Sequence, residues 1–310
     1  MARILVTGAA GFIGRALCRG LVERRHSVLG ATRKPGEAVA GAELRAIGDI
    51  RPQTDWSEHL DGVGIVVHLA HRAHQSADER VGEDEAAAAA LARAAAAAGV
   101  RRLVHMSSVR AMGDATTPGA PFRCTDQPLP RDPYGRDKLA IEHGLRAAVR
   151  QTDLELVILR PPLVYGPGVK ANFRALMRLV ASGLPLPLAA VDNRRSLIFL
   201  DNLVDLTIRA CEHPLAPACV LLARDAIDLS TPDLIRILAA GLDRPARLFA
   251  VPQCSLAPLR RLPRLGPLIG RLTLSLQVED TETRRLLDWR PPISAESGLT
   301  ATAHTFRERS

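Results

Sequence analysis

The sequence predicts an α/β protein with a doubly wound parallel sheet and a smaller C-terminal α/β lobe. Short apolar, β-branched stretches alternate with stretches of helical periodicity up to about residue 165, and the alternation then loosens. We therefore expect residues 1–165 to form the sheet domain, to which a strand near 196–200 and a helix at 203–211 return. Residues 166–310 should form most of the smaller lobe.

The strongest single feature is a glycine-rich turn after the first expected strand, at residues 3–7. Gly8 permits a sharp turn, Gly11 leaves room for a pyrophosphate, and Gly14 lets the following helix pack close to the strand. The free N–H groups and the positive dipole end of that helix attract phosphates. This strand, turn and helix predict a Rossmann dinucleotide-binding domain rather than a glycine turn without a ligand.

The remaining elements follow in the order that such a sheet requires. The alanine-rich stretch at 84–98 predicts a helix that stops at Gly99, because alanine is the best helix former and glycine suits the position after a helix. Thr231 is expected to cap a helix with Pro232 as its first residue. Further strands are expected at 27–31, 44–47, 64–69, 102–106, 154–159 and 220–222, and further helices from 134 and at 173–181.

The end of the second strand indicates which dinucleotide is bound. An acidic residue there would accept hydrogen bonds from the adenosine 2′-hydroxyl, but the sequence has Arg33 and Lys34 instead. These cations suit a 2′-phosphate, so NADP is favoured over NAD, with a solvated loop as the alternative. Asp49, after the third strand, is placed to accept a hydrogen bond from an adenine amino group.

Metal sites, nucleic acid and membrane insertion are not expected. His68, His71 and His74 cluster after the fourth strand, but no carboxylate or cysteine stands near them in the sequence, so strand-end histidines are favoured over a metal site. The five cysteines form no Cys-x-x-Cys pair, which fits reduced thiols. The net charge is +8, but only 3% of residues are aromatic and no helix-turn-helix pattern is present, so an arginine-rich surface is favoured over nucleic-acid binding.

The first strand begins at residue 3, which leaves no room for a signal peptide, and we expect a cytoplasmic protein. No apolar run approaches the roughly 18 residues that a membrane span needs. The basic, proline-rich segment at 256–276 could lie on a membrane surface, but its prolines favour a cover for the smaller lobe.

Three residues predict acid–base chemistry at an alcohol or ketone. Tyr134 and Lys138 lie one helical turn apart, so they share a face. A lysine ammonium and a nicotinamide cation would lower the pKa of the phenol, which could then exchange a proton with substrate while hydride moves to or from the nicotinamide. Ser108, at the carboxyl end of a strand, could hydrogen-bond the same substrate oxygen.

Four motifs stand out along the chain: Gly8-x-x-Gly11-Phe12-Ile13-Gly14, Ser107-Ser108, Tyr134-x-x-x-Lys138 and Arg160-Pro161-x-x-Val164-Tyr165-Gly166-Pro167-Gly168. Together they resemble those of the extended short-chain dehydrogenases/reductases, and more narrowly the NAD-dependent epimerase/dehydratase family that acts on nucleotide sugars. The likeness covers essentially the whole chain and is greatest to bacterial UDP-hexose 4-epimerases and UDP-4-keto-6-deoxy-N-acetylhexosamine 4-reductases.

This resemblance implies a role for each site residue. Ser108, Tyr134 and Lys138 would be catalytic, and Lys138 would also hold the nicotinamide ribose. Ser108, Asn172 and Arg195 would bind a UDP-sugar in the C-terminal substrate lobe, because a guanidinium fork matches a diphosphate. The positions expected to contact the cofactor are Gly8, Gly11, Phe12, Ile13, Gly14, Arg33, Lys34, Asp49, Ile50, Leu69, Ala70, Lys138 and Pro161. A homodimer through the helices at 84–98 and 134–150 is also implied.

The chain departs from the family pattern in three places. Asp84 stands where the family usually has an asparagine, no acid follows the second strand, and Val109 and Arg110 replace the acidic pair of a 4,6-dehydratase. A UDP-4-keto-sugar 4-reductase with NADP or NAD is therefore favoured. The alternatives are a 4-epimerase with retained NAD, acting on UDP-glucose or UDP-N-acetylglucosamine, and, more remotely, a non-enzymatic dinucleotide-binding regulator.

Overall fold

The computed structural model describes residues 1–310 except 36–37, 40, 72–81, 215–219, 253–254, 256–257, 259–265 and 309–310. Its centre is a seven-stranded sheet in the order β3-β2-β1-β4-β5-β6-β9, in which every neighbouring pair is parallel. This confirms the predicted doubly wound sheet. The strands are β1 (Arg3–Thr7), β2 (Ser27–Thr32), β3 (Glu43–Ala46), β4 (Ile65–His68), β5 (Arg102–Met106), β6 (Glu155–Arg160) and β9 (Val220–Leu222).

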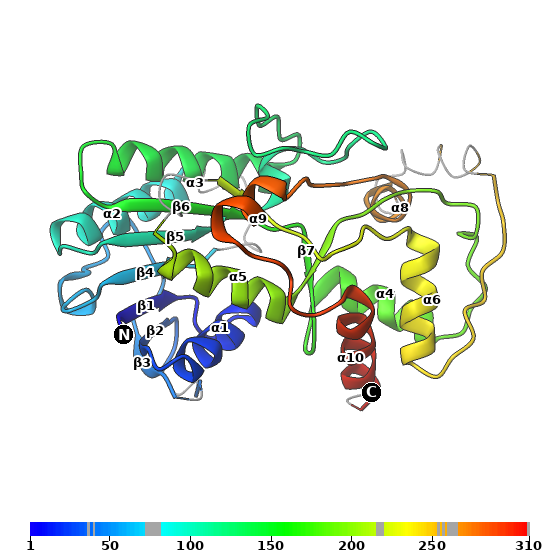
Figure 1. Ribbon diagram of the computed structural model, residues 1–310, viewed down its shortest axis with the longest axis horizontal. Coiled ribbons are helices and arrows are strands. Elements are labelled where there is room, and N and C mark those ends of the chain that lie inside the picture. Colours follow the sequence, from blue (N-terminus) through cyan, green and yellow to red (C-terminus); the bar gives the residue numbers. More distant parts are fainter. Residues whose placement is uncertain are drawn as a thin grey trace.

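Helices cover both faces of this sheet (Figure 1). One face carries α2 (Glu83–Ala97) and α3 (Pro133–Val149), and the other carries α1 (Phe12–Glu23) and α5 (Leu200–Glu212). Because side chains alternate along a strand, β1 serves both layers: Ile4 and Val6 join the core beneath α1 and α5, while Leu5 joins the core beneath α2 and α3. Burial on both faces explains why β1 is a continuous apolar run.

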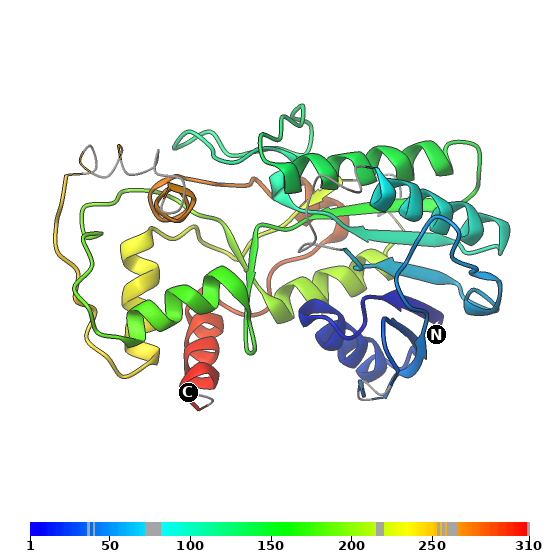
Figure 2. The ribbon, with the colours of Figure 1, turned by 180° about the vertical axis from the view of Figure 1, so that it is seen from behind.

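The C-terminal part of the chain forms a smaller lobe beside the sheet, which Figure 2 shows from behind. It has its own apolar core, which includes Phe173, Leu238 and Leu299. Its elements are β7 (Leu163–Tyr165), α4 (Ala171–Ala181), β8 (Leu197–Phe199), α6 (Thr231–Gly241), α8 (Gly266–Thr273) and α10 (Ala295–Glu308). The short helix α9 (Thr281–Leu287) packs instead on the large sheet, where Leu287 joins the core beneath α1 and α5. Two 3-10 helices, η1 (Ser57–His59) and η2 (Val109–Ala111), lie in loops of the first half.

The strand expected near 196–200 does not enter the large sheet. β8 pairs with β7 in a separate two-stranded sheet, and β9 instead takes the edge position beside β6. The helix that follows β8 does return, since Leu203 and Leu206 of α5 are buried in the same core as Ile4 of β1. The chain therefore crosses between the two parts more than once.

A buried carboxylate joins the two parts. Asp225 accepts hydrogen bonds from the Tyr165 hydroxyl (2.6 Å), the Asn202 amide (2.7 Å) and the Phe199 N–H (3.0 Å). Asn202 in turn binds the backbone of Ile293 through both atoms of its amide. One side chain thus links β7, β8, α5 and the segment before α10.

The N-terminal cap of α6 and the 256–276 segment were both predicted from local sequence. Thr231 does not cap α6: the cap is Ser230, whose hydroxyl accepts from the Asp233 N–H, and Thr231 is the first helical residue. The prediction was wrong by one residue because both positions carry a hydroxyl and only Ser230 has the extended backbone that a cap needs. Much of the 256–276 segment lies outside the described residues. Among the helices that are described, none has the length and apolarity to cross a membrane.

Candidate active site

The turn between β1 and α1 depends on its glycines. Gly8 has φ +70°, and a Cβ there would lie 3.1 Å from the Ala70 nitrogen. A Cβ on Gly14 would lie 2.2 Å from the Gly8 carbonyl oxygen, so the close packing predicted for Gly14 is confirmed. Gly11 caps α1 and has no side chain that could occupy its first N–H groups. The turn therefore presents main-chain donors that a phosphate can approach.

A cavity of about 460 Å³ opens beside this turn, at the carboxyl ends of β1, β2 and β4. The chain order reverses between β1 and β4, and doubly wound sheets bind their ligands at such a switch point. Eight of the residues expected to contact the cofactor line the cavity: Gly8, Gly11, Arg33, Lys34, Asp49, Ile50, Leu69 and Ala70.

The other expected cofactor positions lie outside the cavity lining. Phe12 and Ile13 are partly buried and pack against the sheet core, and Gly14 packs against the glycine turn. Pro161 is buried beside the serine loop, where its carbonyl accepts from the Val109 N–H (2.9 Å). The lining residues that we did not predict include Ala10, Thr32, Gly48, His68, His71 and Asp84.

Arg33 and Asp49 face each other at the cavity wall that follows β2 and β3. Their Nε and Oδ1 atoms form an ion pair of 3.3 Å, and 65% of the Arg33 side chain is exposed. The sequence interpretation gave these residues separate ligands, a 2′-phosphate and an adenine amino group. In the structure each already has the other as a partner, so the two roles are coupled.

Beneath the cavity, His68 is buried and neutral. Thr7 Oγ1 lies 2.8 Å from His68 Nδ1 and also accepts from the N–H groups of Leu69 and Ala70, so its proton points to the histidine. This assigns Nδ1 as the acceptor. Burial, with the nearby charges of Lys138 and His71, lowers the pKa of His68 to about 3, and burial also holds the pKa of the stacked His105 well below its ordinary value.

The structure brings the predicted catalytic residues together at the carboxyl end of β5. Ser108 follows this strand, and its hydroxyl lies near enough to Tyr134, in the first turn of α3, to lower the pKa of the phenol. Asp132 caps that turn by accepting from the Gly135 N–H (2.6 Å) and also pairs with Arg110. Tyr134 keeps 39% of its surface exposed and is not among the residues that line the cavity, but its ring packs against His71, which does line it.

The expected lowering of the Tyr134 pKa by Lys138 is not found. Burial raises the pKa of the phenol, the Ser108 hydroxyl lowers it, and the carboxylates of Asp132 and Asp137 raise it further. Lys138 instead points its ammonium at the Met106 carbonyl oxygen (3.1 Å). Burial lowers the pKa of Lys138 to about 8, against the opposite influence of nearby carboxylates.

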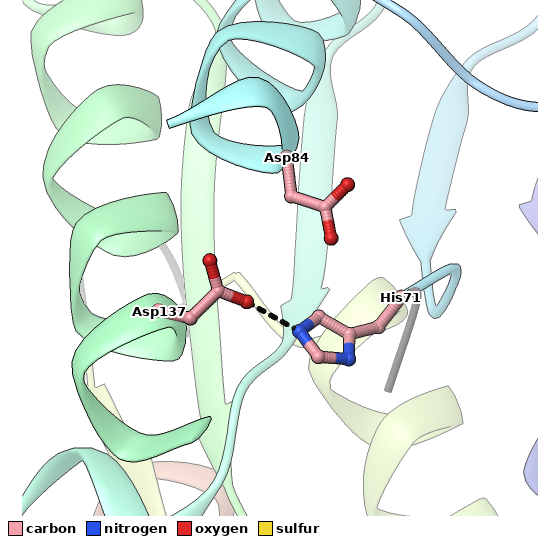
Figure 3. Close-up of side chains that lie close together, drawn as sticks. All are labelled: His71, Asp84 and Asp137. Atoms are coloured by element: carbon pink, nitrogen blue, oxygen red, sulfur yellow. Dashed lines mark hydrogen bonds and ion pairs between the residues drawn. The ribbon is translucent and has the colours of Figure 1, made fainter. Parts of the chain in front are cut away.

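A histidine and two aspartates form a cluster that the sequence interpretation missed (Figure 3). His71 follows β4, Asp84 opens α2 and Asp137 belongs to α3, and their side-chain nitrogen and oxygen atoms lie within 4.8 Å of one another. We expected no carboxylate near the histidines because we judged distance along the sequence, and the fold supplies two from distant helices. His74 lies outside the described residues.

This cluster is already hydrogen-bonded. His71 Nε2 lies 2.7 Å from Asp137 Oδ2, so one nitrogen and one carboxylate oxygen have each other as partners. The buried ammonium of Lys138 is close enough for Asp137 and Asp84 to raise its pKa, and a second cation between them would meet its repulsion. Asp137 could have been found from the sequence, since it lies inside the Tyr-x-x-x-Lys motif, three residues after Tyr134.

The expected substrate residues lie on the lobe side. Arg195 precedes β8, and its Nη1 donates to the Leu274 carbonyl (3.1 Å). Burial lowers its pKa to about 10, helped by the positive charges of Arg110 and Arg271, so both of these arginines lie near Arg195. Asn172 lies in the first turn of α4 and is exposed.

Comparison with known proteins agrees with this geometry. Residues 4–219 match the model of the NAD dependent epimerase/dehydratase family. A "UDP-glucose 4-epimerase" from Vibrio cholerae is 36% identical over 98% of this chain and 95% of its own length. A "probable dTDP-4,6-dihydroxy-2-methyloxan-3-one 4-ketoreductase" from Streptomyces antibioticus is 32% identical over 68% of each chain.

A solved structure shows the same fold. The UDP-glucuronic acid 4-epimerase from Bacillus cereus in complex with NAD aligns with a TM-score of 0.79 and 22% identity over 99% of both chains. The family match extends over more than half of the chain, and the Vibrio relative is similar along almost all of it. The protein therefore belongs to the NAD-dependent epimerase/dehydratase family, and it is an NAD(P)-dependent enzyme of the extended short-chain dehydrogenase/reductase type.

Proposed function

We propose that the protein oxidises or reduces C4 of a UDP-hexose or UDP-N-acetylhexosamine. The observation that carries this proposal is the proximity of the Tyr134 and Ser108 hydroxyl groups at the carboxyl edge of the sheet. Two hydroxyl groups held together there suit a single substrate oxygen, and Arg195 on the lobe side suits the diphosphate.

The residues present fit a nicotinamide dinucleotide. Gly8 and Gly11 would hold its pyrophosphate, Arg33 and Lys34 would meet its adenosine end, and Lys138 would hold the nicotinamide ribose. Two observations support this assignment. A cavity lies at the switch point, and the glycine turn beside it is so close-packed that a Cβ on Gly8 or Gly14 would crowd main-chain atoms. When bound, the dinucleotide supplies or accepts the hydride.

The protein's own groups handle the proton. For reduction of a 4-keto sugar, Tyr134 gives its phenolic proton to the C4 oxygen while Ser108 hydrogen-bonds that oxygen. Because burial raises the pKa of Tyr134, the phenol is protonated at neutral pH, which is the state that a proton donor needs. The two cations in place of an acid after β2 favour a 4-reductase as the first candidate.

A 4-epimerase with retained NAD is the second candidate. The relative that is 36% identical along nearly the whole chain carries that activity in its name. In that reaction Tyr134 would first take the proton from the C4 hydroxyl and later return it. The family assignment, with Tyr134 and Lys138 both present, argues against a non-enzymatic regulator.

Retained cofactor and substrate choice separate the two candidates. The absorbance spectrum of the purified protein should show no bound dinucleotide, and the protein should reduce a UDP-4-keto-hexose with added NADPH or NADH. Retained NAD together with interconversion of UDP-glucose and UDP-galactose would instead establish the epimerase. Turnover of neither substrate class would refute both.

Replacing Tyr134 tests the catalytic assignment itself. Tyr134→Phe should lower kcat by about 10³-fold, because it removes the proton donor, while the dinucleotide Kd stays unchanged. Tyr165→Phe is a matched control, since the chain has two tyrosines and this one is buried in the lobe. The control should lower Tm through its lost bond to Asp225 and leave kcat unaltered. Equal kcat values for Tyr134→Phe and wild type would show that the assignment is wrong.

The proposed homodimer concerns α2 and α3. Ala88, Leu91, Ile141 and Leu145 on these helices are buried in the sheet core, so their apolar faces are used within the chain. A dimer would have to use the outward faces of the same helices. Light scattering of the purified protein would give the mass, and a value near 33.4 kDa would exclude the dimer.

A further inference from the structure

The ring of His71 packs against the ring of Tyr134. Their centroids are 5.3 Å apart, and the planes are nearly perpendicular at 88°. Such edge-to-face contacts stabilise a defined ring orientation. The contact matters because 39% of the Tyr134 surface is exposed, so its ring has few other contacts to fix its orientation.

A second contact fixes His71. Its Nε2 is bonded to Asp137 Oδ2 at 2.7 Å, and only 11% of the histidine side chain is exposed. Asp137 lies three residues after Tyr134 on α3, so both are on neighbouring positions of one helix face. His71 therefore contacts α3 twice, and these contacts tie the end of β4 to the turn that carries Tyr134.

The charges around this pair come from four elements. Asp84 faces it from α2, and the buried ammonium of Lys138 faces it from α3. His68 on β4 and His105 on β5 are near enough for the charge of His71 to lower their pKa values, and both are neutral. The negative charge of Asp137 thus acts on both Lys138 and Tyr134, and that of Asp84 acts on Lys138.

We propose that His71, oriented by Asp137, is a positioning residue that holds the Tyr134 ring at the edge of the dinucleotide cavity. The claim that His71 affects catalysis, the catalytic part, rests on the proposed function. The claim that His71 holds the Tyr134 ring in place, the positional part, does not. Holding a reacting group in place is worth much in rate, since a shift of about 1 Å can cost about 100-fold. His71 also lines the cavity, so a direct contact with the dinucleotide is the competing role.

NMR of the folded protein tests the positional part without any substrate. With ¹³C-labelled tyrosine the spectrum contains two tyrosines, and Tyr134→Phe assigns them. His71→Ala should shift and broaden the Tyr134 ring signals and leave those of Tyr165 in place. His143→Ala is the matched control, because His143 is an exposed histidine on the same helix. Tyr134 signals that match the control would overturn the proposal.

Kinetics test the catalytic part. His71→Ala should lower kcat about 10- to 100-fold with the KM of the dinucleotide changed less than about threefold. His71→Phe keeps a ring against Tyr134 and should recover part of kcat. A raised dinucleotide KM with unchanged kcat would make His71 a cofactor contact and overturn the positioning role.

Asp137→Asn separates the effect of the Asp137 carboxylate charge from the effect of its hydrogen bond with His71. The amide can still bond His71, but it removes a carboxylate that raises the pKa of Tyr134, so the midpoint of the pH–rate profile should move to lower pH. An unmoved midpoint with wild-type kcat would overturn the role of Asp137. If the wild-type protein turns over no UDP-sugar, the proposed function fails, and the NMR result still decides whether His71 holds Tyr134.

Discussion

The two halves of the site are built in different ways. The dinucleotide half consists of main chain and small residues at the carboxyl ends of adjacent strands, with Gly8, Gly11 and Ala70 around one cavity. The proposed substrate half consists of long side chains from distant segments, where Arg110 and Arg271 both lie near Arg195. The first half is specified by local sequence, and the second depends on how the whole chain folds back.

This difference predicts separable effects. Side-chain substitutions in the substrate half should alter UDP-sugar binding and spare the dinucleotide. Substitutions in the dinucleotide half should change only the charge around a binding surface that is made of main chain. Their effects on dinucleotide binding should be smaller because the main chain supplies most of the contacts.

The largest effect should come from Arg195. Arg195→Ala should raise the KM for the UDP-sugar about 100-fold, because a guanidinium that is charged at neutral pH would be lost from a diphosphate. Arg195→Lys should recover only part of this affinity, since the fork is lost. Arg236→Ala, on an exposed ion pair of α6, is the control and should change nothing. A matching rise in the dinucleotide KM would show that the halves are not separable.

A second effect concerns the neutral histidine beneath the dinucleotide half. The pKa of His68 is about 3 in the folded protein, below the value of about 6.5 expected when unfolded, so only the unfolded chain takes up a proton as pH falls. The stability that comes from the neutral ring is complete above pH 6.5 and is lost progressively toward pH 3. Between pH 6.5 and 5 the loss is about 2 kcal/mol for this one residue.

Urea unfolding of His68→Asn measures that contribution. Asparagine keeps an acceptor near the position of Nδ1, so the free energy of unfolding should decline less steeply with falling pH than in wild type. His143→Asn, at an exposed position of α3, should keep the wild-type slope. Parallel slopes in all three proteins would contradict a neutral His68.

The smallest effect should be at Arg33. Arg33→Asp should weaken NADPH about tenfold and NADH about threefold or less, because the 2′-phosphate loses a cation and meets Asp49 as a second negative charge. The change is modest since Arg33 is largely exposed and its interactions are screened. Fluorescence titration with both dinucleotides checks this, and equal weakening of the two would remove Arg33 from cofactor choice.

Local sequence was sufficient for the sheet and the glycine turn. The spacing of apolar residues shows which faces of a helix or strand are buried, and this spacing can be read from a few consecutive residues. The same holds for Tyr134 and Lys138, whose spacing alone puts them on one face of α3. The position of β8 could not be read in this way, since a three-residue strand can pair with either sheet and only long-range contacts decide.

The pKa shifts and the charged contacts of the site could also not be predicted from the sequence. Lys138 was expected to lower the pKa of Tyr134, but its ammonium points to a carbonyl on β5, and burial dominates the phenol. The hydrogen-bond partner of His71 comes from α3, 66 residues further along the chain. Side-chain direction and desolvation arise only when the elements have packed.

The hydrogen bonds of Asp225 have a consequence for how the molecule melts. Because this buried carboxylate holds β7, β8 and α5 together, and the Leu287 and Trp289 side chains from the C-terminal segment enter the core under the sheet, neither part can loosen alone without exposing groups of the other. The sheet and the lobe form one cooperative unit, and heat should unfold them in a single calorimetric transition.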